Sequence, residues 1–395
     1  MSVTAPKGFR ASGVAAGLKA SGATDVALVV NDGPATAAAG VFTANRVQAA
    51  PVRWSRQVLR AGKVRAVVLN SGGANACTGP GGFQDTHATA EHVATTLSAT
   101  GGTDVGAGEV AVCSTGLIGE RLPMDKLLAG VTSAVAGLSG DAGPVAAEAI
   151  MTTDTRPKTT LVDRTAQPGG RAWRVGGMAK GAGMLAPAMA TMLCVLTTDA
   201  FADAVDLDAA LREACRTTFD RVDSDGCLST NDTVLLLASG ASGVTPSAGE
   251  LTAAVTAACA DLARQLIADA EGASKEVAVE VVGAASEADA VQVGRAVARN
   301  NLVKTALFGN DPNWGRILAA VGTTSATFDP DQLDVAINDV WICRDGAAAA
   351  PRDQVDLTGR QVYIRISLHA GADTATIWTN DLSHAYVHEN SAYST

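Results

Sequence analysis

The sequence predicts an α/β fold in which helices pack on layered sheets. Short runs rich in β-branched residues alternate with helical stretches along the first third of the chain, which is the pattern of an α/β layer structure. Hydrophobic residues make up 47% of the chain and charged residues 18%, so a substantial apolar core can form. A length of 395 residues allows two or three domains, or one large α/β body with an appended part.

The first third supplies the alternating elements. A helix over residues 124–138 places Leu127, Leu128, Val131 and Val135 on one stripe, which is the spacing of an amphipathic helix. The strands that we expect here are 25–30, 65–70 and 109–113, and the helices are 85–98, 124–138 and 144–151.

The middle of the chain departs from this alternation of strands and helices. Two extended pieces, 159–164 and 171–175, flank the turn-forming sequence Gln-Pro-Gly-Gly. An irregular, Gly-rich segment over 178–187 then runs directly into 189–198, which has the composition of a buried strand. A Gly-rich loop that abuts a buried strand is a place to look for chemistry.

The second half returns to alternating elements and becomes β-rich at its end. A smaller C-terminal subdomain is expected to begin near residue 325, after a loop over 308–315. The expected helices are 207–219, 247–270 and 287–300, and the expected strands are 233–238, 275–282, 333–337, 361–368 and 374–379.

Composition and charge exclude several classes of protein. The net charge is -10 and the basic residues are scattered, so we expect no nucleic-acid groove. The five histidines lack zinc-ligand spacing, so no metal site is expected. The seven cysteines form no CxxC pair and indicate reduced thiols in a cytoplasmic protein. A leader peptide and an apolar run of about 18 residues are both missing, so we expect no membrane association.

The dipeptide Ala190-Thr191 lies where the Gly-rich loop meets the buried strand. A threonine hydroxyl is a weak nucleophile without a neighbouring base, and a chain-terminal amine, with a pKa of about 7.7–8.0, can be that base within one residue. Thr191 would gain such an amine if the chain cut itself before it. The alternative is an ordinary strand threonine, since Ala-Thr is a common dipeptide.

The stretch around Thr191 closely resembles the self-cleavage segment of the ornithine acetyltransferase family. The resemblance extends over nearly the whole chain, in the same order. The segments that carry it are Lys180-Gly-Ala-Gly-Met-Leu-Ala-Pro-Ala-Met-Ala-Thr-Met-Leu, Phe42-Thr-Ala-Asn, Asn70-Ser-Gly-Gly-Ala-Asn-Ala, Cys113-Ser-Thr-Gly-Leu-Ile-Gly, Ala149-Ile-Met-Thr-Thr-Asp-Thr, Asp223-Ser-Asp-Gly, Asn310-Asp-Pro-Asn-Trp-Gly-Arg and His388-Glu-Asn-Ser-Ala-Tyr-Ser-Thr.

The resemblance implies a fold, an organisation and a reaction. The fold is an α-β-β-α sandwich cleaved into an α chain (1–190) and a β chain, in which 191–324 carries the nucleophile and 325–395 forms a C-terminal α/β subdomain. Two cleaved protomers would assemble as α2β2. The reaction moves acetyl from N-acetylornithine to glutamate in arginine biosynthesis, by a ping-pong route through an acetyl-Thr191 ester and without a cofactor. Acetyl-coenzyme A remains open as a second donor.

The resemblance also assigns roles to residues of this sequence. Thr115 and Gly116 would form the oxyanion hole, although spacing alone favours a plain turn there. Lys180 would bind a substrate carboxylate rather than lie on the surface, and Glu271 would bind a substrate ammonium rather than solvent. Thr152 matches a further ligand, with Thr153 as a substitute. The residues implied to bind substrate are Thr152, Lys180, Thr191, Glu271, Asn390 and Thr395.

Two other classes of function remain as alternatives. A self-cleaving aminopeptidase or amidase would use the same nucleophile, with water in place of glutamate as the acceptor. A non-catalytic small-molecule binding protein would remain one uncut chain.

Overall fold

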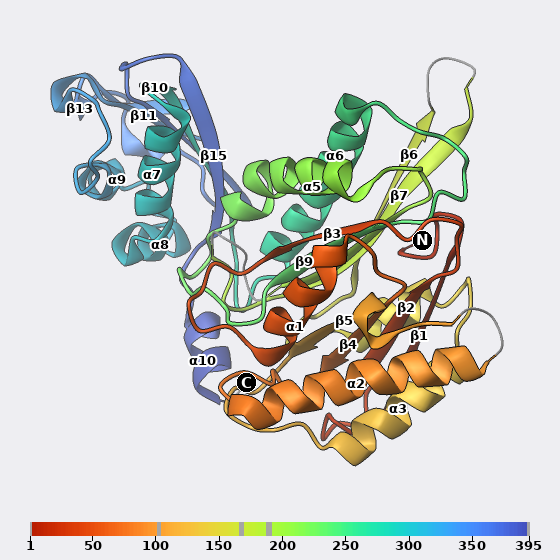
Figure 1. The fold of residues 1–395 in the computed structure, drawn as a ribbon. Coiled ribbons are helices and arrows are strands. Elements are labelled where there is room, and N and C mark those ends of the chain that lie inside the picture. Colours follow the sequence, from red (N-terminus) through yellow and green to blue (C-terminus); the bar gives the residue numbers. More distant parts are fainter. Residues whose placement is uncertain (1, 101–103, 166–169, 187–191, 393–395) are drawn as a thin grey trace.

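The computed structural model describes residues 2–100, 104–165, 170–186 and 192–392. Two stacked sheets form its main body, with helices on both outer faces (Figure 1). The order of layers is helices, sheet, sheet, helices, which is the predicted α-β-β-α sandwich. The fold prediction is therefore confirmed.

The first sheet has four strands in the order β1-β2-β4-β5. Helices α2 and α3 cover its outer face, while α4 packs on β1 (Figure 1). Helix α1 covers the open edge at β5, where the Ser55 hydroxyl donates to the Val112 carbonyl at 2.7 Å and accepts from its N–H at 2.9 Å. The bounds are β1 Phe9–Val14, β2 Val26–Asn31, β4 Ala66–Ser71, β5 Val110–Thr115, α1 Ala50–Val58, α2 Gly79–Ala99, α3 Met124–Ala136 and α4 Gly143–Ala149.

The second sheet has five strands in the order β3-β9-β8-β7-β6, covered by α5 and α6. Side chains of β8 alternate between the two sides, as a strand with two buried faces requires. Leu193 and Val195 belong to the core between the sheets, whereas Cys194 and Leu196 pack with α5 and α6. The bounds are β3 Ala38–Phe42, β6 Lys158–Thr165, β7 Ala172–Lys180, β8 Leu193–Thr198, β9 Thr233–Ala238, α5 Ala204–Thr217 and α6 Ala248–Ala268.

A third sheet makes the smaller lobe, with its own apolar core. Its order is β13-β12-β11-β14-β10-β15, so the sheet includes β10, which lies before the expected boundary near residue 325. Helix α10 leaves this lobe and returns along the body (Figure 1). The bounds are β10 Glu276–Ala284, β11 Asp334–Ile337, β12 Val340–Arg344, β13 Ala347–Ala348, β14 Gln361–Ser367, β15 Asp373–Asn380, α7 Glu287–Ala298, α8 Asn301–Phe308, α9 Trp314–Val321 and α10 His384–Ala392.

Helix α6 is the one helix in the described ranges that is long and apolar enough to cross a membrane by composition. Half of its most apolar window is buried inside the protein. Leu251, Leu262 and Leu266 lie in the core shared with α5 and the second sheet. This packing is that of a core helix.

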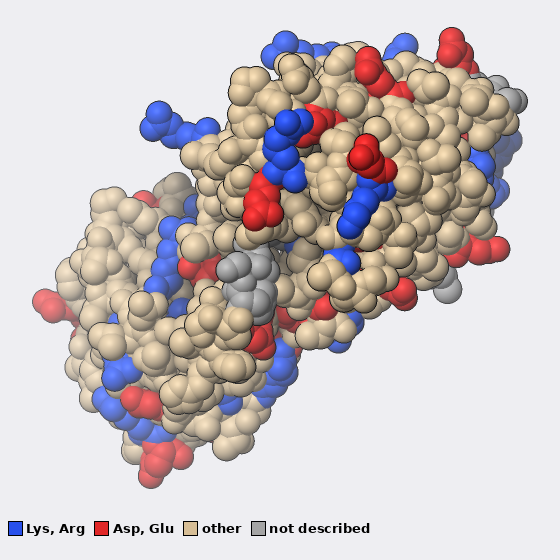
Figure 2. Space-filling view, turned by 90° about the horizontal axis from the view of Figure 1, so that it is seen from below, with Lys and Arg blue, Asp and Glu red and all other residues tan. Residues whose placement is uncertain are grey.

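Charged side chains of both signs are interspersed on the face drawn in Figure 2. The same view shows a large and a small lobe, the latter formed by the third sheet and its helices. The interspersed charges on this face agree with the scattered basic residues of the sequence.

Candidate active site

A cavity of about 500 Å³ opens at the ends of strands from both sheets of the sandwich. The first sheet contributes the end of β5, and the second contributes the end of β7. The rest of the wall comes from the segments after α4 and α6, from residues 18–21 and 229–231, and from the far end of α10. The predicted site residues that line this one cavity are Thr115, Gly116, Thr152, Thr153, Lys180, Glu271 and Asn390.

Thr115 and Gly116 lie where β5 ends against the Gly-Gly turn after β4. The Thr115 carbonyl accepts from the N–H groups of Gly72 and Gly73 at 2.9 and 3.0 Å, which fixes the turn. Gly116 has φ +128°, and a Cβ there would lie 2.6 Å from the Gly73 nitrogen. Only glycine therefore fits at position 116.

The hydroxyl of Thr115 has a defined partner. Lys180 Nζ donates to Thr115 Oγ1 at 3.2 Å. A hydroxyl that accepts from an ammonium keeps its own proton free to donate elsewhere. The Gly116 N–H has no acceptor among the residues that the structure describes. These two donors are suited to an oxyanion in the cavity.

Lys180 is a buried cation, with 1% of its surface exposed. Burial lowers the pKa of Lys180, and the nearby carboxylates of Asp154, Asp232 and Glu271 oppose that shift. Lys180 lines the cavity although it is almost fully buried, so an anionic group of a ligand beside its ammonium would meet little water. This is a place for a substrate carboxylate or a developing negative charge.

Glu271 is held from two sides. The Thr153 hydroxyl donates to Glu271 Oε1 at 2.7 Å, and Asn390 Nδ2 donates to Oε2 at 3.0 Å. Thr153 is thus engaged with protein, whereas the Thr152 hydroxyl has no partner within the described part of the chain. Of the two candidates, Thr152 has its hydroxyl available for a ligand.

Helix α10 is docked through the turn after α6. The Ser383 hydroxyl donates to the Gly272 carbonyl at 2.5 Å and accepts from the Tyr386 N–H at 3.0 Å. A Cβ at Gly272, which has φ +61°, would lie 2.1 Å from the Tyr386 nitrogen. The glycine after Glu271 is therefore what lets α10 approach and bring Asn390 to the cavity.

Ala190, Thr191 and Thr395 lie outside the described residues. Their neighbour Met192 is fixed, because its N–H donates to Asp232 Oδ1 at 3.0 Å and its carbonyl accepts from the Thr233 N–H at 3.0 Å. Burial raises the pKa of Asp232 well above its usual value, and the second carboxyl oxygen has no partner among the described residues.

A family model, that of the ArgJ family, matches residues 10–395 of this chain. The arginine biosynthesis bifunctional protein ArgJ of Streptomyces avermitilis is 67% identical over 394 residues, which is 100% of both chains. Its counterpart in Thermobifida fusca is 60% identical over 395 residues, again 100% of both chains.

The chain belongs to the ArgJ family. The predicted family, ornithine acetyltransferase of arginine biosynthesis, is thereby confirmed, and so is the prediction of an acyltransferase. A crystal structure of ornithine acetyltransferase from Mycobacterium tuberculosis in complex with ornithine is 66% identical, with a TM-score of 0.45; the match covers 47% of this chain and 94% of that one.

This ArgJ chain also has a buried ionic cluster behind the cavity, which the sequence reasoning missed. Lys158 Nζ contacts Asp154 Oδ1 and Asp269 Oδ2 at 2.6 Å each, with the lysine fully buried. Asp154 accepts in addition from the N–H groups of Thr152 and Gly181 at 3.0 and 2.7 Å. Burial by itself would raise the pKa of Asp154. The combined effect of Lys180, Lys158 and the Gly181 N–H is larger and opposite, so the pKa is lowered. The cluster thus fixes the backbone at Thr152 and next to Lys180, which both line the cavity.

Asn231 is a second residue of this ArgJ chain that the sequence reasoning missed. Its side-chain amide donates to the carbonyls of Ala74 and Ser114 at 2.6 and 2.8 Å. It thereby links the segment before β9 to two others, which are the turn after β4 and the end of β5. The polar run Ser-Thr-Asn-Asp before a buried strand was the signal that could have found it.

Proposed function

We propose that this chain cuts itself between Ala190 and Thr191 and then transfers acetyl from N-acetylornithine to glutamate through Thr191. The observation that carries the proposal is the single cavity that unites Thr115, Gly116, Lys180, Glu271 and Asn390 beside the strand that begins after Thr191. An oxyanion hole, a cation and an anion in one cavity suit an acylated amino acid.

Maturation forms and breaks one bond at Ala190. The Thr191 hydroxyl attacks the Ala190 carbonyl carbon, the C–N bond breaks, and the proton moves to the nitrogen as the acyl group shifts to oxygen. Water then hydrolyses the ester, which leaves a carboxylate on Ala190 and a free amine on Thr191. Asp232 supports this step because it accepts from the N–H of Met192, the residue that follows the nucleophile in the sequence.

Turnover uses the freed residue twice. The Thr191 hydroxyl attacks the acetyl carbonyl of N-acetylornithine, its proton passes through the Thr191 amine to the departing nitrogen, and ornithine leaves. Thr115 and Gly116 hold the oxyanion. The α-amine of glutamate then attacks the acetyl ester, and N-acetylglutamate leaves with the Thr191 hydroxyl restored. Lys180 and Thr152 bind the substrate carboxylate, while Glu271, Asn390 and Thr395 bind the ammonium end.

Intact mass under denaturing conditions tests the processing. Two chains are expected, the second beginning with Thr191, and Thr191→Ala should remain a single chain. A Thr191→Ala protein that is still split at this bond would contradict the proposal, and an uncut wild-type chain would favour a non-catalytic binding protein.

Acetyl transfer tests the substrate assignment against the hydrolase alternative. With N-acetylornithine and glutamate, equal amounts of ornithine and N-acetylglutamate are expected, with ping-pong kinetics. Release of acetate without N-acetylglutamate would identify an amidase.

We further propose acetyl-coenzyme A as a second donor and an α2β2 assembly. The relatives' name "bifunctional" supports a second activity. Replacing N-acetylornithine by acetyl-coenzyme A in the same assay tests the donor, and native mass spectrometry tests the assembly.

The C-terminal segment supplies a further test of this cavity. Deleting residues 389–395 removes Asn390 and Thr395, so we expect higher KM values for both N-acetylornithine and glutamate. Self-cleavage should survive, because it needs the loop, Thr191 and the oxyanion donors. Unchanged kinetics would remove both residues from the site.

A further inference from the structure

The wall of the 500 Å³ cavity contains a second cation, Lys19, which has no role in the reaction proposed above. Among the described residues that line this cavity, the charged side chains are Lys19, Lys180 and Glu271. The wall therefore carries two positive charges and one negative charge. N-acetylornithine has one carboxylate and one ammonium, so it would complement Lys180 and Glu271 and leave the charge of Lys19 without a partner on the ligand.

The loop that carries Lys19 is fixed by a buried carboxylate. Asp25, which is fully buried, accepts from the backbone N–H groups of Ala16 and Leu18 at 2.6 Å each and from that of Lys19 at 3.0 Å. Hydrogen bonds to a carboxylate are among the stronger ones in proteins. The backbone of Lys19 is therefore held in place on the cavity wall before a ligand arrives.

The same loop packs against the turn beside the predicted oxyanion donors. A Cβ on Gly72 would lie 2.9 Å from the Cβ of Leu18, and the Gly72 N–H donates to the Thr115 carbonyl at 2.9 Å. Lys180 Nζ donates to the hydroxyl of the same threonine at 3.2 Å. Lys19 and Lys180 thus both belong to segments that pack around Thr115, where the acetyl group would react.

The ammonium of Lys19 can bind a ligand and keep its present contact. Its Nζ donates to the Thr24 carbonyl at 2.8 Å, the one acceptor that it has among the described residues, and an ammonium has three N–H donors. Burial lowers the pKa of Lys19, and the carboxylates of Asp25 and Asp154 oppose that shift. Asp154 accepts from the N–H of the cavity residue Thr152, so the field of Lys19 reaches the cavity.

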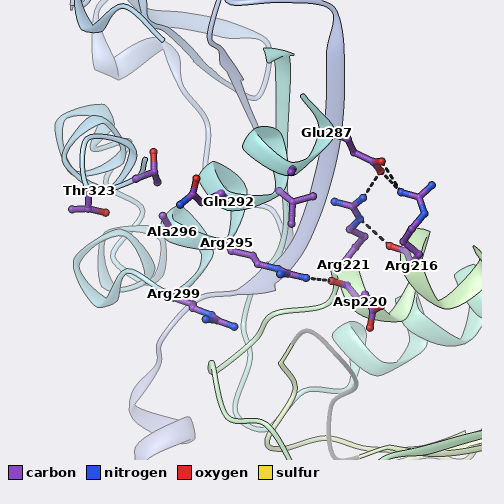
Figure 3. A pocket seen from close by; sticks show the side chains of 12 residues that line it. Arg216, Asp220, Arg221, Glu287, Gln292, Arg295, Ala296, Arg299 and Thr323 are labelled. Atoms are coloured by element: carbon purple, nitrogen blue, oxygen red, sulfur yellow. Dashed lines mark hydrogen bonds and ion pairs between the residues drawn. The ribbon is translucent and has the colours of Figure 1, made fainter. Parts of the chain in front are cut away.

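A larger cavity, of about 640 Å³, has more cations, but they are paired within the protein. Figure 3 shows that Arg216 and Arg221 reach the same carboxylate, that of Glu287. Arg299 contacts the buried carboxylate of Asp223 at 2.7 Å. An anionic ligand would compete there with carboxylates of the protein, whereas beside Lys19 it would add to a contact with a carbonyl.

We propose that Lys19 binds the side-chain carboxylate of glutamate, the acetyl acceptor. The inference rests on the proposed transfer of acetyl to glutamate. Glutamate has two carboxylates, and its single amine must face the acetyl ester in order to attack it. The two carboxylates match the two lysines of the wall, and both would be repelled by Glu271. One cavity then serves two substrates, with Lys180 and Glu271 for N-acetylornithine and with both lysines for glutamate.

Acceptor kinetics of processed protein test this role, with N-acetylornithine as the donor and glutamate or glutamine as the acceptor. Glutamine keeps the shape of glutamate and lacks the charge of its side chain. The wild-type protein should prefer glutamate in kcat/KM by about tenfold or more, the scale of one hydrogen bond between charged groups. Lys19→Gln should lower kcat/KM for glutamate by about the same factor and leave that for glutamine unchanged.

The donor half of the reaction separates this role from damage to the site. In a ping-pong reaction, kcat/KM for each substrate reports its own half-reaction, so Lys19→Gln should keep the wild-type value for N-acetylornithine. Lys19→Arg retains the charge and should keep most of the preference for glutamate. Lys63→Gln is the matched control, because Lys63 is exposed and outside the cavity, yet its loss changes the net charge equally.

Three results would overturn the role of Lys19. They are an unchanged kcat/KM for glutamate in Lys19→Gln, an equal loss for glutamine, and an equal loss for N-acetylornithine. The last two would mean that Lys19 only supports the shape of its loop. Wild-type protein that releases acetate and forms no N-acetylglutamate would instead overturn the proposed function, and this inference with it.

Discussion

The cavity that we propose as the catalytic site has two walls of different construction. The wall from the sheets is made of deeply buried polar groups, since Thr115 and Lys180 are 2% and 1% exposed and stand in front of the fully buried Lys158. The second wall comes from α10, which has no buried residue and reaches the cavity with Asn390.

We interpret this difference as a division of labour, in which the buried wall takes part in the chemical step and α10 takes part in substrate binding. Oxyanion donors act only if they are fixed in place before the charge develops, and buried, mutually bonded groups are fixed by their packing. A surface helix held by a few contacts opens at low cost, which suits a group that must let substrates enter and products leave. We therefore expect changes in the buried wall to reduce kcat or stability, and changes in α10 to raise KM.

The largest effect is expected at Thr115. Removing one oxyanion donor typically costs about 10²–10³ in kcat, so Thr115→Ala should lose that much while KM changes far less. Thr115→Ser keeps the hydroxyl and should recover most of the rate. Because the same donor should assist self-cleavage, the measurement is steady-state acetyl transfer per processed protomer, with the cleaved fraction counted by intact mass. A wild-type kcat in Thr115→Ala would exclude Thr115 from the reaction.

The next effect concerns the ionic cluster behind the same wall. Lys158→Met leaves the carboxylates of Asp154 and Asp269 buried without their shared cation, which should lower the free energy of unfolding by about 3–5 kcal/mol. Denaturant unfolding measures this, with Lys63→Met as a control because Lys63 is exposed. Equal stability of the two variants would show that the cluster contributes nothing.

A smaller effect is expected where α10 meets the body. Gly272→Ala places a Cβ 2.1 Å from the Tyr386 nitrogen, so α10 must move away and take Asn390 with it. We expect KM for N-acetylornithine to rise and kcat to change little. Gly249→Ala is the matched control, since a Cβ there meets nothing within 4 Å. Unchanged KM in Gly272→Ala would mean that the position of α10 does not matter.

The layers of the body could be read from the sequence because their signals are local. The predicted strands over 65–70 and 109–113 correspond to β4 and β5, and the helix over 124–138 corresponds to α3. Strands β1 and β3 were missed. Helix α2 begins at Gly79. The sequence predicted its start at residue 85, because Gly-Pro-Gly-Gly at the true start has the composition of a loop.

Long-range pairing and burial of charge could not be read in this way. Strand β10 pairs with β14 across more than 80 residues, so the extent of the third sheet is absent from any local pattern. Lys158 and Asp154 have the composition of a solvated loop, and only the fold reveals that they are buried together. Thr115 and Gly116 were singled out through family resemblance, since the local pattern indicates an ordinary turn.

The smallest effect, and the sharpest test of the two walls, is expected at Asn390. Its amide donates to Glu271 Oε2 at 3.0 Å while the Thr153 hydroxyl holds Oε1, so Asn390→Ala leaves the carboxylate anchored on the side of the buried wall. An exposed hydrogen bond to a charged group contributes about 1 kcal/mol, so KM should rise roughly five- to tenfold, while kcat and self-cleavage stay near their wild-type values. Ser391→Ala is the control, because the Ser391 hydroxyl donates to the His388 carbonyl within α10 and Ser391 is not among the described residues that line the cavity. A fall in kcat as large as that of Thr115→Ala would show that α10 takes part in the chemical step, and the division between a catalytic wall and a recognition wall would then be wrong.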